Sequence, residues 1–134
     1  MSTLQGVPAD DVPRAWHIVS SLVHQYLTES REHRWEAADI LAMILERDAQ
    51  LWLVVGDGGL LAVVVTRIVQ YPQAKECDLF MVHGELPDDW PAHLEQLCTW
   101  AQAQGCESTA VMAHKGQARR FAGWQSRQIY IVRD

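Results

Sequence analysis

Two stretches in the first third of the chain repeat their apolar residues with the spacing of an α-helix. The first runs from Val12 to Tyr26, with a pair of aspartates just before it to serve as N-cap and with Pro13 tolerated in its first turn. The second runs from Ala37 to Leu45, after a polar break at residues 30–34. This pattern predicts two consecutive helices before any clear strand.

The apolar spacing then shortens to that of strands. Leu51–Val55 and Leu60–Val65 flank the turn sequence Gly56–Gly59, which predicts a hairpin. The second of these strands is apolar at every position, which is typical of a strand covered on both faces. Cys77–Val82 predicts a third strand that returns beside it. We therefore expect Leu60–Val69 to be the central strand, between the other two.

The rest of the chain alternates between helical and strand patterns. Helical spacing resumes at Trp90, Ser108–Ala113 predicts a short strand, and Gly116–Phe121 predicts a short helix. Gln128–Val132 predicts a final strand. The order predicts one α/β domain over residues 1–134, in which helices cover both faces of a mixed sheet made of an antiparallel meander and C-terminal strands.

Composition and charge narrow the class of protein. Hydrophobic residues make up 49% and charged residues 21%, and no apolar run approaches the roughly 18 residues that span a bilayer. No secretory signal is visible, so we expect a cytoplasmic protein without a membrane partner. Eleven basic and seventeen acidic side chains give a net charge of −6, which disfavours a nucleic-acid partner because such binding depends on phosphate neutralisation.

The metal-binding residue types lack the spacing of a metal site. Cys77, Cys98 and Cys106 are an odd number without a Cys-x-x-Cys pair, and the six histidines show no ligand spacing. We therefore expect reduced, mostly buried thiols and no bound metal.

The order of predicted elements resembles the GCN5-related N-acetyltransferase (GNAT) fold. In that family two early helices, an antiparallel meander, a helix and a strand–helix–strand end surround acetyl-coenzyme A. The resemblance covers almost the whole chain and implies that Thr3–Val7 is a rudimentary first strand.

Several short stretches also look like a group of short GNAT-like proteins encoded by phages and prophages of proteobacteria. The stretches are Asp39-Ile40-Leu41, Gln50–Val54, Val65–Ile68 with Tyr71-Pro72, and Trp100-Ala101 with Gly105-Cys106. The resemblance implies a phage-encoded protein that acts in the host cytoplasm.

The chain departs from the catalytic pattern of the GNAT family. Those enzymes bind the cofactor pyrophosphate on backbone N–H groups of an Arg/Gln-x-x-Gly-x-Gly/Ala loop at a helix N-terminus. The matching segment His83–Trp90 has one glycine, Gly84, together with a proline and three carboxylates. Arg119 stands where the family's tyrosine acid would be, and arginine stays protonated at neutral pH. We therefore expect no catalytic residue, and Gly84 is the one weak candidate for a cofactor contact.

Charge is unevenly spread along the second half of the chain. Residues 76–114 contain seven acidic side chains and no lysine or arginine, whereas residues 115–134 carry a net charge of +4. A face of one sign with aromatic residues at its margin attracts a partner of opposite charge. The same carboxylates also fit a plain role in helix capping and solubility. We expect a surface for a protein partner or for self-association at Glu85, Asp88, Asp89, Trp90 and Trp100.

Two functions follow from these features. The first is a non-catalytic GNAT-like scaffold, a phage or prophage accessory protein that acts through protein contacts and needs no cofactor. The alternative is an active acyl-coenzyme A-dependent N-acyltransferase with a divergent acetyl-coenzyme A site.

Overall fold

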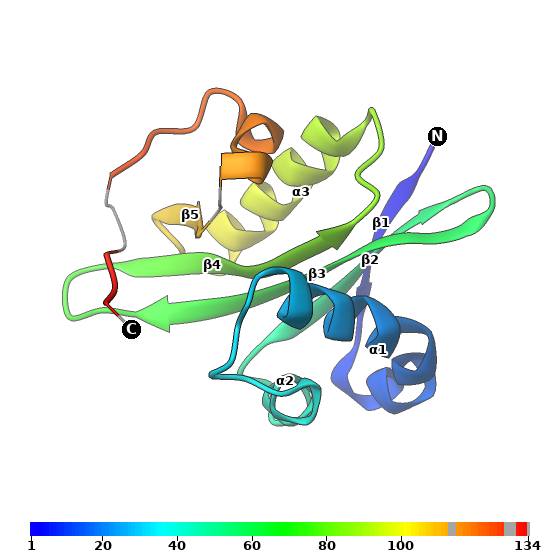
Figure 1. Ribbon diagram of the computed structural model, residues 1–134. Coiled ribbons are helices and arrows are strands. Elements are labelled where there is room, and N and C mark those ends of the chain that lie inside the picture. The colour runs from blue at the N-terminus through cyan, green and yellow to red at the C-terminus, as the bar shows by residue number, and fades with distance from the viewer. Residues whose placement is uncertain (113–114, 128–130, 134) are drawn as a thin grey trace.

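The computed structural model describes residues 1–112, 115–127 and 131–133. Two α-helices separate the first strand from a run of three strands, and a helix, a strand and a short helix follow (Figure 1); η denotes a 3-10 helix. The elements are β1 (Thr3–Val7), η1 (Ala9–Asp11), α1 (Val12–Glu29), α2 (Ala37–Leu45), β2 (Gln50–Gly56), β3 (Gly59–Gln70), β4 (Lys75–Gly84), α3 (Trp90–Ala103), β5 (Ser108–Val111) and η2 (Lys115–Phe121).

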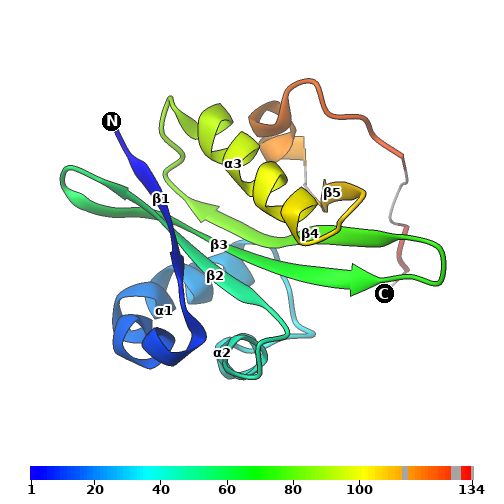
Figure 2. The same cartoon turned by 180° about the vertical axis from the view of Figure 1, so that it is seen from behind.

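The five strands form one sheet in the order β1-β2-β3-β4-β5. The first four strands are antiparallel to their neighbours, and β5 runs parallel to β4. The β2–β3 and β3–β4 connections project from opposite ends of the sheet (Figures 1 and 2). The α/β class, the central position of β3 and the strand Thr3–Val7 are therefore confirmed.

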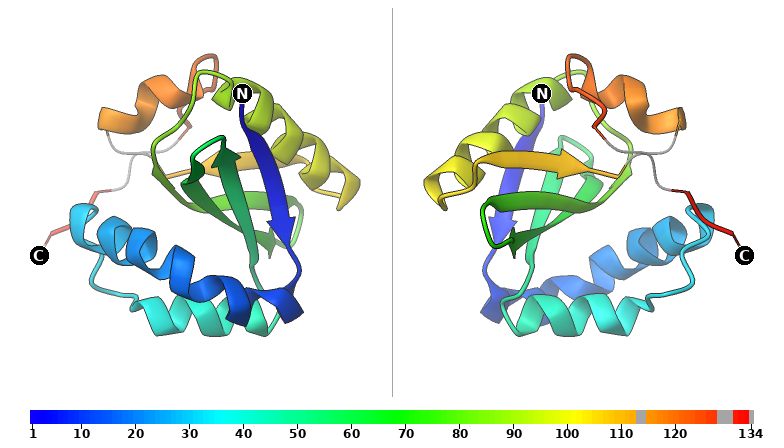
Figure 3. Two further views of the ribbon diagram at one scale, coloured as in Figure 1. Left: turned by 90° about the vertical axis from the view of Figure 1, so that its right-hand side faces the viewer. Right: turned by 90° about the vertical axis from the view of Figure 1, so that its left-hand side faces the viewer.

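Helices cover both faces of the sheet and enclose two cores (Figure 3). On one face, α1 and α2 bury Val19 and Ile40 against Val63 and Val65 of β3. On the other face, α3 packs against β3 and β4, where Val64 belongs to the core. The three consecutive valines of β3 are fully buried. This explains why the strand is apolar at every position, since alternate side chains enter different cores.

The boundaries of the helices follow from local hydrogen bonds. At the start of α2, the Glu36 side chain accepts from the N–H of the third helical residue, and Asp39 accepts from the Glu36 N–H at 2.8 Å in a capping box. At the start of α1, Asp11 makes no such cap and pairs with Arg14 instead. A positive φ of 89° at Gly105 follows α3, as is common after a helix end.

The C-terminal expectations need correction. The predicted strand Ser108–Ala113 ends at Val111, and the predicted helix Gly116–Phe121 is the 3-10 helix η2. Of the predicted final strand Gln128–Val132, residues 128–130 lie outside the described residues. Ile131 and Val132 are 85% and 62% exposed and lie outside any strand, so that part of the prediction is wrong. None of the described helices is long and apolar enough to cross a membrane.

Gly84 ends β4 in a conformation that requires glycine. Its φ is +124°, and a Cβ added there would lie 2.4 Å from the Leu61 carbonyl oxygen on β3. The next residue, Glu85, donates its N–H to the same oxygen at 2.9 Å. The close approach of two backbones therefore accounts for this glycine.

We predict that Gly84→Ala lowers the free energy of unfolding by more than about 2 kcal/mol, because the left-handed conformation and the backbone clash add to each other. Gly58→Ala is the matched control, since a Cβ at Gly58 meets nothing within 4 Å. Urea unfolding measures both variants. The control should change the free energy of unfolding by no more than about 0.5 kcal/mol. Equal stability of the two variants would contradict this account of Gly84.

Candidate functional site

The candidate site lies at the end of β4, between α1 on one face of the sheet and α3 with η2 on the other (Figures 1 and 3). β5 pairs with β4 only along Glu76–Leu79. Beyond Leu79, the outer edge of β4 pairs with no strand among the described residues. The backbone groups of this edge therefore need other partners.

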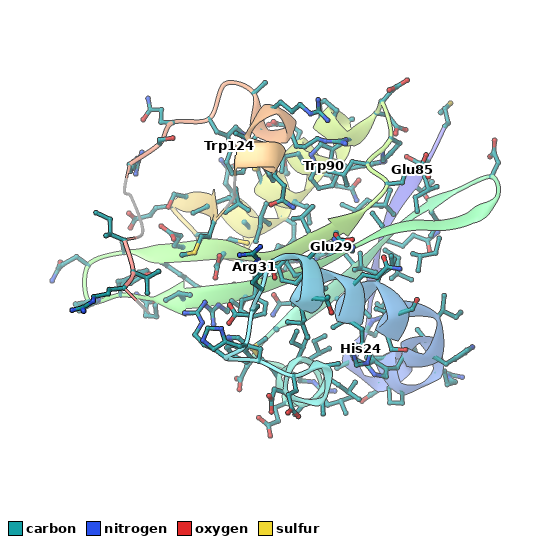
Figure 4. The ribbon with its side chains drawn as sticks, in the orientation of Figure 1. His24, Glu29, Arg31, Glu85, Trp90 and Trp124 are labelled. Carbon is teal, nitrogen blue, oxygen red and sulfur yellow. The ribbon has the colours of Figure 1, made fainter. Side chains whose placement is uncertain are left out.

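The segment η2 closes this edge with side-chain hydrogen bonds. Gln117 Nε2 donates to the Val82 carbonyl at 3.4 Å, and a guanidinium nitrogen of Arg120 donates to the Leu86 carbonyl at 3.3 Å. The indole Nε1–H of Trp90 donates to the Arg120 carbonyl at 3.1 Å and ties α3 to η2. Figure 4 labels Trp90 and shows it beside η2. Three hydrogen bonds thus connect η2 to β4, to the loop that follows it and to α3.

Backbone hydrogen bonds occupy some of the amides in the loop between β4 and α3 and in the first turn of α3. The N–H groups of Glu85, Trp90 and Ala92 donate to backbone carbonyls at 2.9, 3.0 and 3.0 Å. Pro87 and Pro91 have no N–H to donate. An anion site at a helix N-terminus needs several amides pointing at the ligand. With two prolines and the carboxylates of Glu85 and Asp88, this segment is a poor fit for the pyrophosphate of acetyl-coenzyme A.

Two small cavities adjoin η2. One has a volume of about 100 Å³ and is lined by Val82, His83, Gly84, Leu86, Gln117 and Arg120. The other has a volume of about 210 Å³ and is lined by Pro87, Trp90, Pro91, Arg119, Arg120 and Ala122. Sites for drug-sized ligands occupy roughly 300–1,000 Å³. Neither cavity is large enough for coenzyme A, which is a larger molecule still.

Arg119 and Gly84, the two residues compared with the catalytic pattern of the GNAT family, each lie beside one of these cavities. Arg119 is exposed at the rim of the larger cavity, and Gly84 borders the smaller one. Packing against β3 explains the glycine without a ligand. A guanidinium at position 119 cannot protonate a leaving thiolate, because it does not give up its proton at neutral pH.

The predicted partner surface needs correction at Trp90. This side chain is 2% exposed, and its indole N–H is taken by the Arg120 carbonyl, so it is not available to a partner. Trp100 is half-buried and packs edge-on against Trp52, with ring centroids 5.1 Å apart. Ten residues separate the two tryptophans along α3, which places them about 15 Å apart along the helix axis. The two tryptophans therefore do not belong to one exposed patch.

The three acidic members of that surface also differ from one another. Glu85 and Asp88 are exposed in the loop (Glu85 is labelled in Figure 4). Asp89 accepts hydrogen bonds from the Ser2 N–H at 3.0 Å and from the Ser2 hydroxyl at 2.6 Å. These bonds from Ser2 lower the pKa of Asp89. Asp89 thus fastens the start of the chain to α3.

His83 is a site residue that the sequence analysis did not select. Its Nε2 lies 3.4 Å from Gln25 Oε1 and 3.7 Å from Glu29 Oε2, both on α1. The Tyr26 ring packs edge-on against the imidazole with centroids 6.0 Å apart. Burial is the main cause that raises the pKa of Tyr26. An imidazole beside a carboxylate can accept and pass on a proton.

The cysteines and histidines form no metal centre in the described part of the chain. No group of three or more potential ligands comes together there. Cys77 and Cys106 are buried, and burial raises the pKa of Cys77 to about 12. These thiols are therefore protonated at neutral pH and poorly reactive.

Comparison with solved structures identifies the fold. No family model and no curated protein matches the sequence. Among solved structures, a GCN5-related N-acetyltransferase from Ralstonia eutropha JMP134 superimposes with a TM-score of 0.73 and 12% identity, over 100% of this chain and 99% of that one. The fold is that of the GNAT acetyltransferases.

Two further structures with the GNAT fold show the same agreement. A predicted acetyltransferase from Clostridium acetobutylicum, solved with acetyl-CoA, gives a TM-score of 0.72 at 12% identity over 100% of this chain and 96% of its own. A ribosomal-protein-alanine N-acetyltransferase from Brucella melitensis biovar Abortus 2308 gives a TM-score of 0.66 at 14% sequence identity. The alignment covers 98% of this chain and 100% of that one. At such identities the likeness establishes the fold alone. The resemblance to phage proteins stays a prediction.

We predict that Ser2→Ala destabilises the protein at neutral pH and has little effect in acid. The lowered pKa of Asp89 means that its contribution to stability is present above the ordinary pKa of about 4 and is lost as pH falls through the folded value. Urea unfolding of both proteins at pH 7 and near pH 2.5 measures this difference. The substitution removes only the hydroxyl, which bonds Asp89 and lies 2.7 Å from His93 Nε2, and keeps the backbone N–H bond to Asp89. A gap that stays the same at both pH values would exclude the hydroxyl bond to Asp89 as its cause.

Proposed function

We propose that this protein is a GNAT-fold binding protein that does not use acetyl-coenzyme A and acts through contacts with another protein. The observation that carries the proposal is the position of η2 across the end of β4. Gln117 and Arg120 there donate to the carbonyls of Val82 and Leu86. An acyl-coenzyme A chain lying along this edge would have to displace both side chains.

The charge of the loop supports the same proposal. Acetyl-coenzyme A carries several negative charges, and the loop offers the exposed carboxylates of Glu85 and Asp88. A like-charge pair at about 4 Å costs roughly 1 kcal/mol in water and about 4 kcal/mol near a protein surface. We propose that these two carboxylates belong to a protein-binding surface. The phage resemblance adds the proposal of an accessory role in a host cell.

One observation favours the alternative, an active N-acyltransferase. His83 and Glu29 form an acid–base pair at the end of β4, with nitrogen and oxygen 3.7 Å apart. A neutral imidazole in that position can take a proton from an amine before it attacks an acyl group. In that case η2 must move away to admit the cofactor.

Calorimetric titration with acetyl-coenzyme A separates the two functions. We expect no complex tighter than about 100 μM, because the loop carries exposed carboxylates and Gln117 and Arg120 of η2 occupy the carbonyls at the end of β4 and in the loop. The Clostridium acetobutylicum protein, which was solved with acetyl-CoA, is the positive control. A one-to-one complex tighter than that limit, together with release of free coenzyme A that is lost in His83→Ala, would establish the alternative.

A further inference from the structure

The cavity of about 210 Å³ between the start of α3 and η2 combines apolar walls with positive charge. Pro87, Pro91 and Ala122 provide apolar walls, and Arg119 and Arg120 contribute two guanidinium groups. This volume suits a single side chain and is below the roughly 300 Å³ at which sites for small-molecule ligands begin. The cavity therefore fits a carboxylate side chain better than a cofactor.

The two arginines at this cavity have no carboxylate partner among the described residues. The arginine–carboxylate pairs among the described residues involve Arg14, Arg34, Arg47 and Arg67. Arg120 is half-buried and uses one nitrogen on the Leu86 carbonyl, while Arg119 makes no hydrogen bond or ion pair in the described part of the chain. Arginine binds carboxylates through a planar fork of donors, often in pairs of parallel hydrogen bonds. Most of those donors remain free here.

A carboxylate follows one of the cavity residues directly in the sequence. Asp88 follows the cavity residue Pro87 and forms no ion pair with any described residue. Opposite charges therefore occur at and beside the cavity lining without pairing with each other among the described residues. A twofold rotation of such a face brings each positive patch onto the negative patch of the other copy. The face is thus complementary to itself.

We propose that the cavity receives Asp88 of a second copy of this chain, so that two copies exchange Asp88 side chains across a twofold axis. The exposed residues Pro91 and Ala122 would meet around this axis and exclude water from the two charge pairs. This dimer rests on the proposed function only in that the protein acts through protein contacts. Its test does not involve acetyl-coenzyme A.

Charge exchange between two exposed positions tests the dimer. In sedimentation at about 100 μM and low salt, the wild-type chain of 15.2 kDa should give a mass of about 30 kDa. Asp88→Arg alone and Arg119→Asp alone should each be monomeric, because each places like charges together twice. An equal mixture of the two variants should recover the dimer, since both interchain pairs are then of opposite charge.

The control is Arg127→Asp, which makes the same charge change at an exposed arginine that does not line the cavity. This control should leave the dimer intact. Thermal unfolding followed by circular dichroism checks that each variant is folded. Arg119→Gln, a milder change, should weaken the dimer at least about tenfold. A monomeric wild type, a mixture that stays monomeric, or equal dissociation by Arg127→Asp would overturn the proposal. None of these results would change the outcome expected with acetyl-coenzyme A.

Discussion

The unpaired end of β4 is the constraint on which the rest of the site depends. β5 stops pairing at Leu79, yet Val82 is almost fully buried, so its outward carbonyl needs a hydrogen-bond donor from the protein. Gln117 supplies that donor, and Arg120 supplies another to the loop that follows. The position of η2 is thus tied to the backbone of β4, and the shape of the site follows from it.

The interactions that complete the fold also occupy the region from which we derive the proposed function. In a sheet of this family, the end of β4 is where the resemblance places the cofactor loop. Here the same place holds a strand end that only glycine can adopt, a loop whose amides are partly used internally, and a short helix fastened over both. A ligand in this position would have to compete with these intrachain hydrogen bonds.

Much of the fold could be predicted from periodicity, whereas the site could not. The buried valines of β3 and the helical stripes are local patterns, and each predicted its element. The contacts of the site join distant residues: Ser2 meets Asp89, and Gln25 meets His83, across 87 and 58 positions. Acidic neighbours made Trp90 look exposed, but the packing of η2 buries it. The spacing of residues along the sequence cannot predict contacts between such distant positions.

The position of η2 can be measured through one indole proton. Trp90 Nε1–H donates to the Arg120 carbonyl, and Trp52 Nε1–H donates to the buried Thr66 hydroxyl at 3.0 Å. Hydrogen exchange followed by NMR, with Trp90→Phe and Trp52→Phe to assign the signals, compares the two protons. If η2 is held across β4, the Trp90 indole proton exchanges slowly, at a rate comparable to that of Trp52. Rapid exchange at Trp90 while Trp52 stays protected would show that η2 leaves the end of β4 open and would contradict the account.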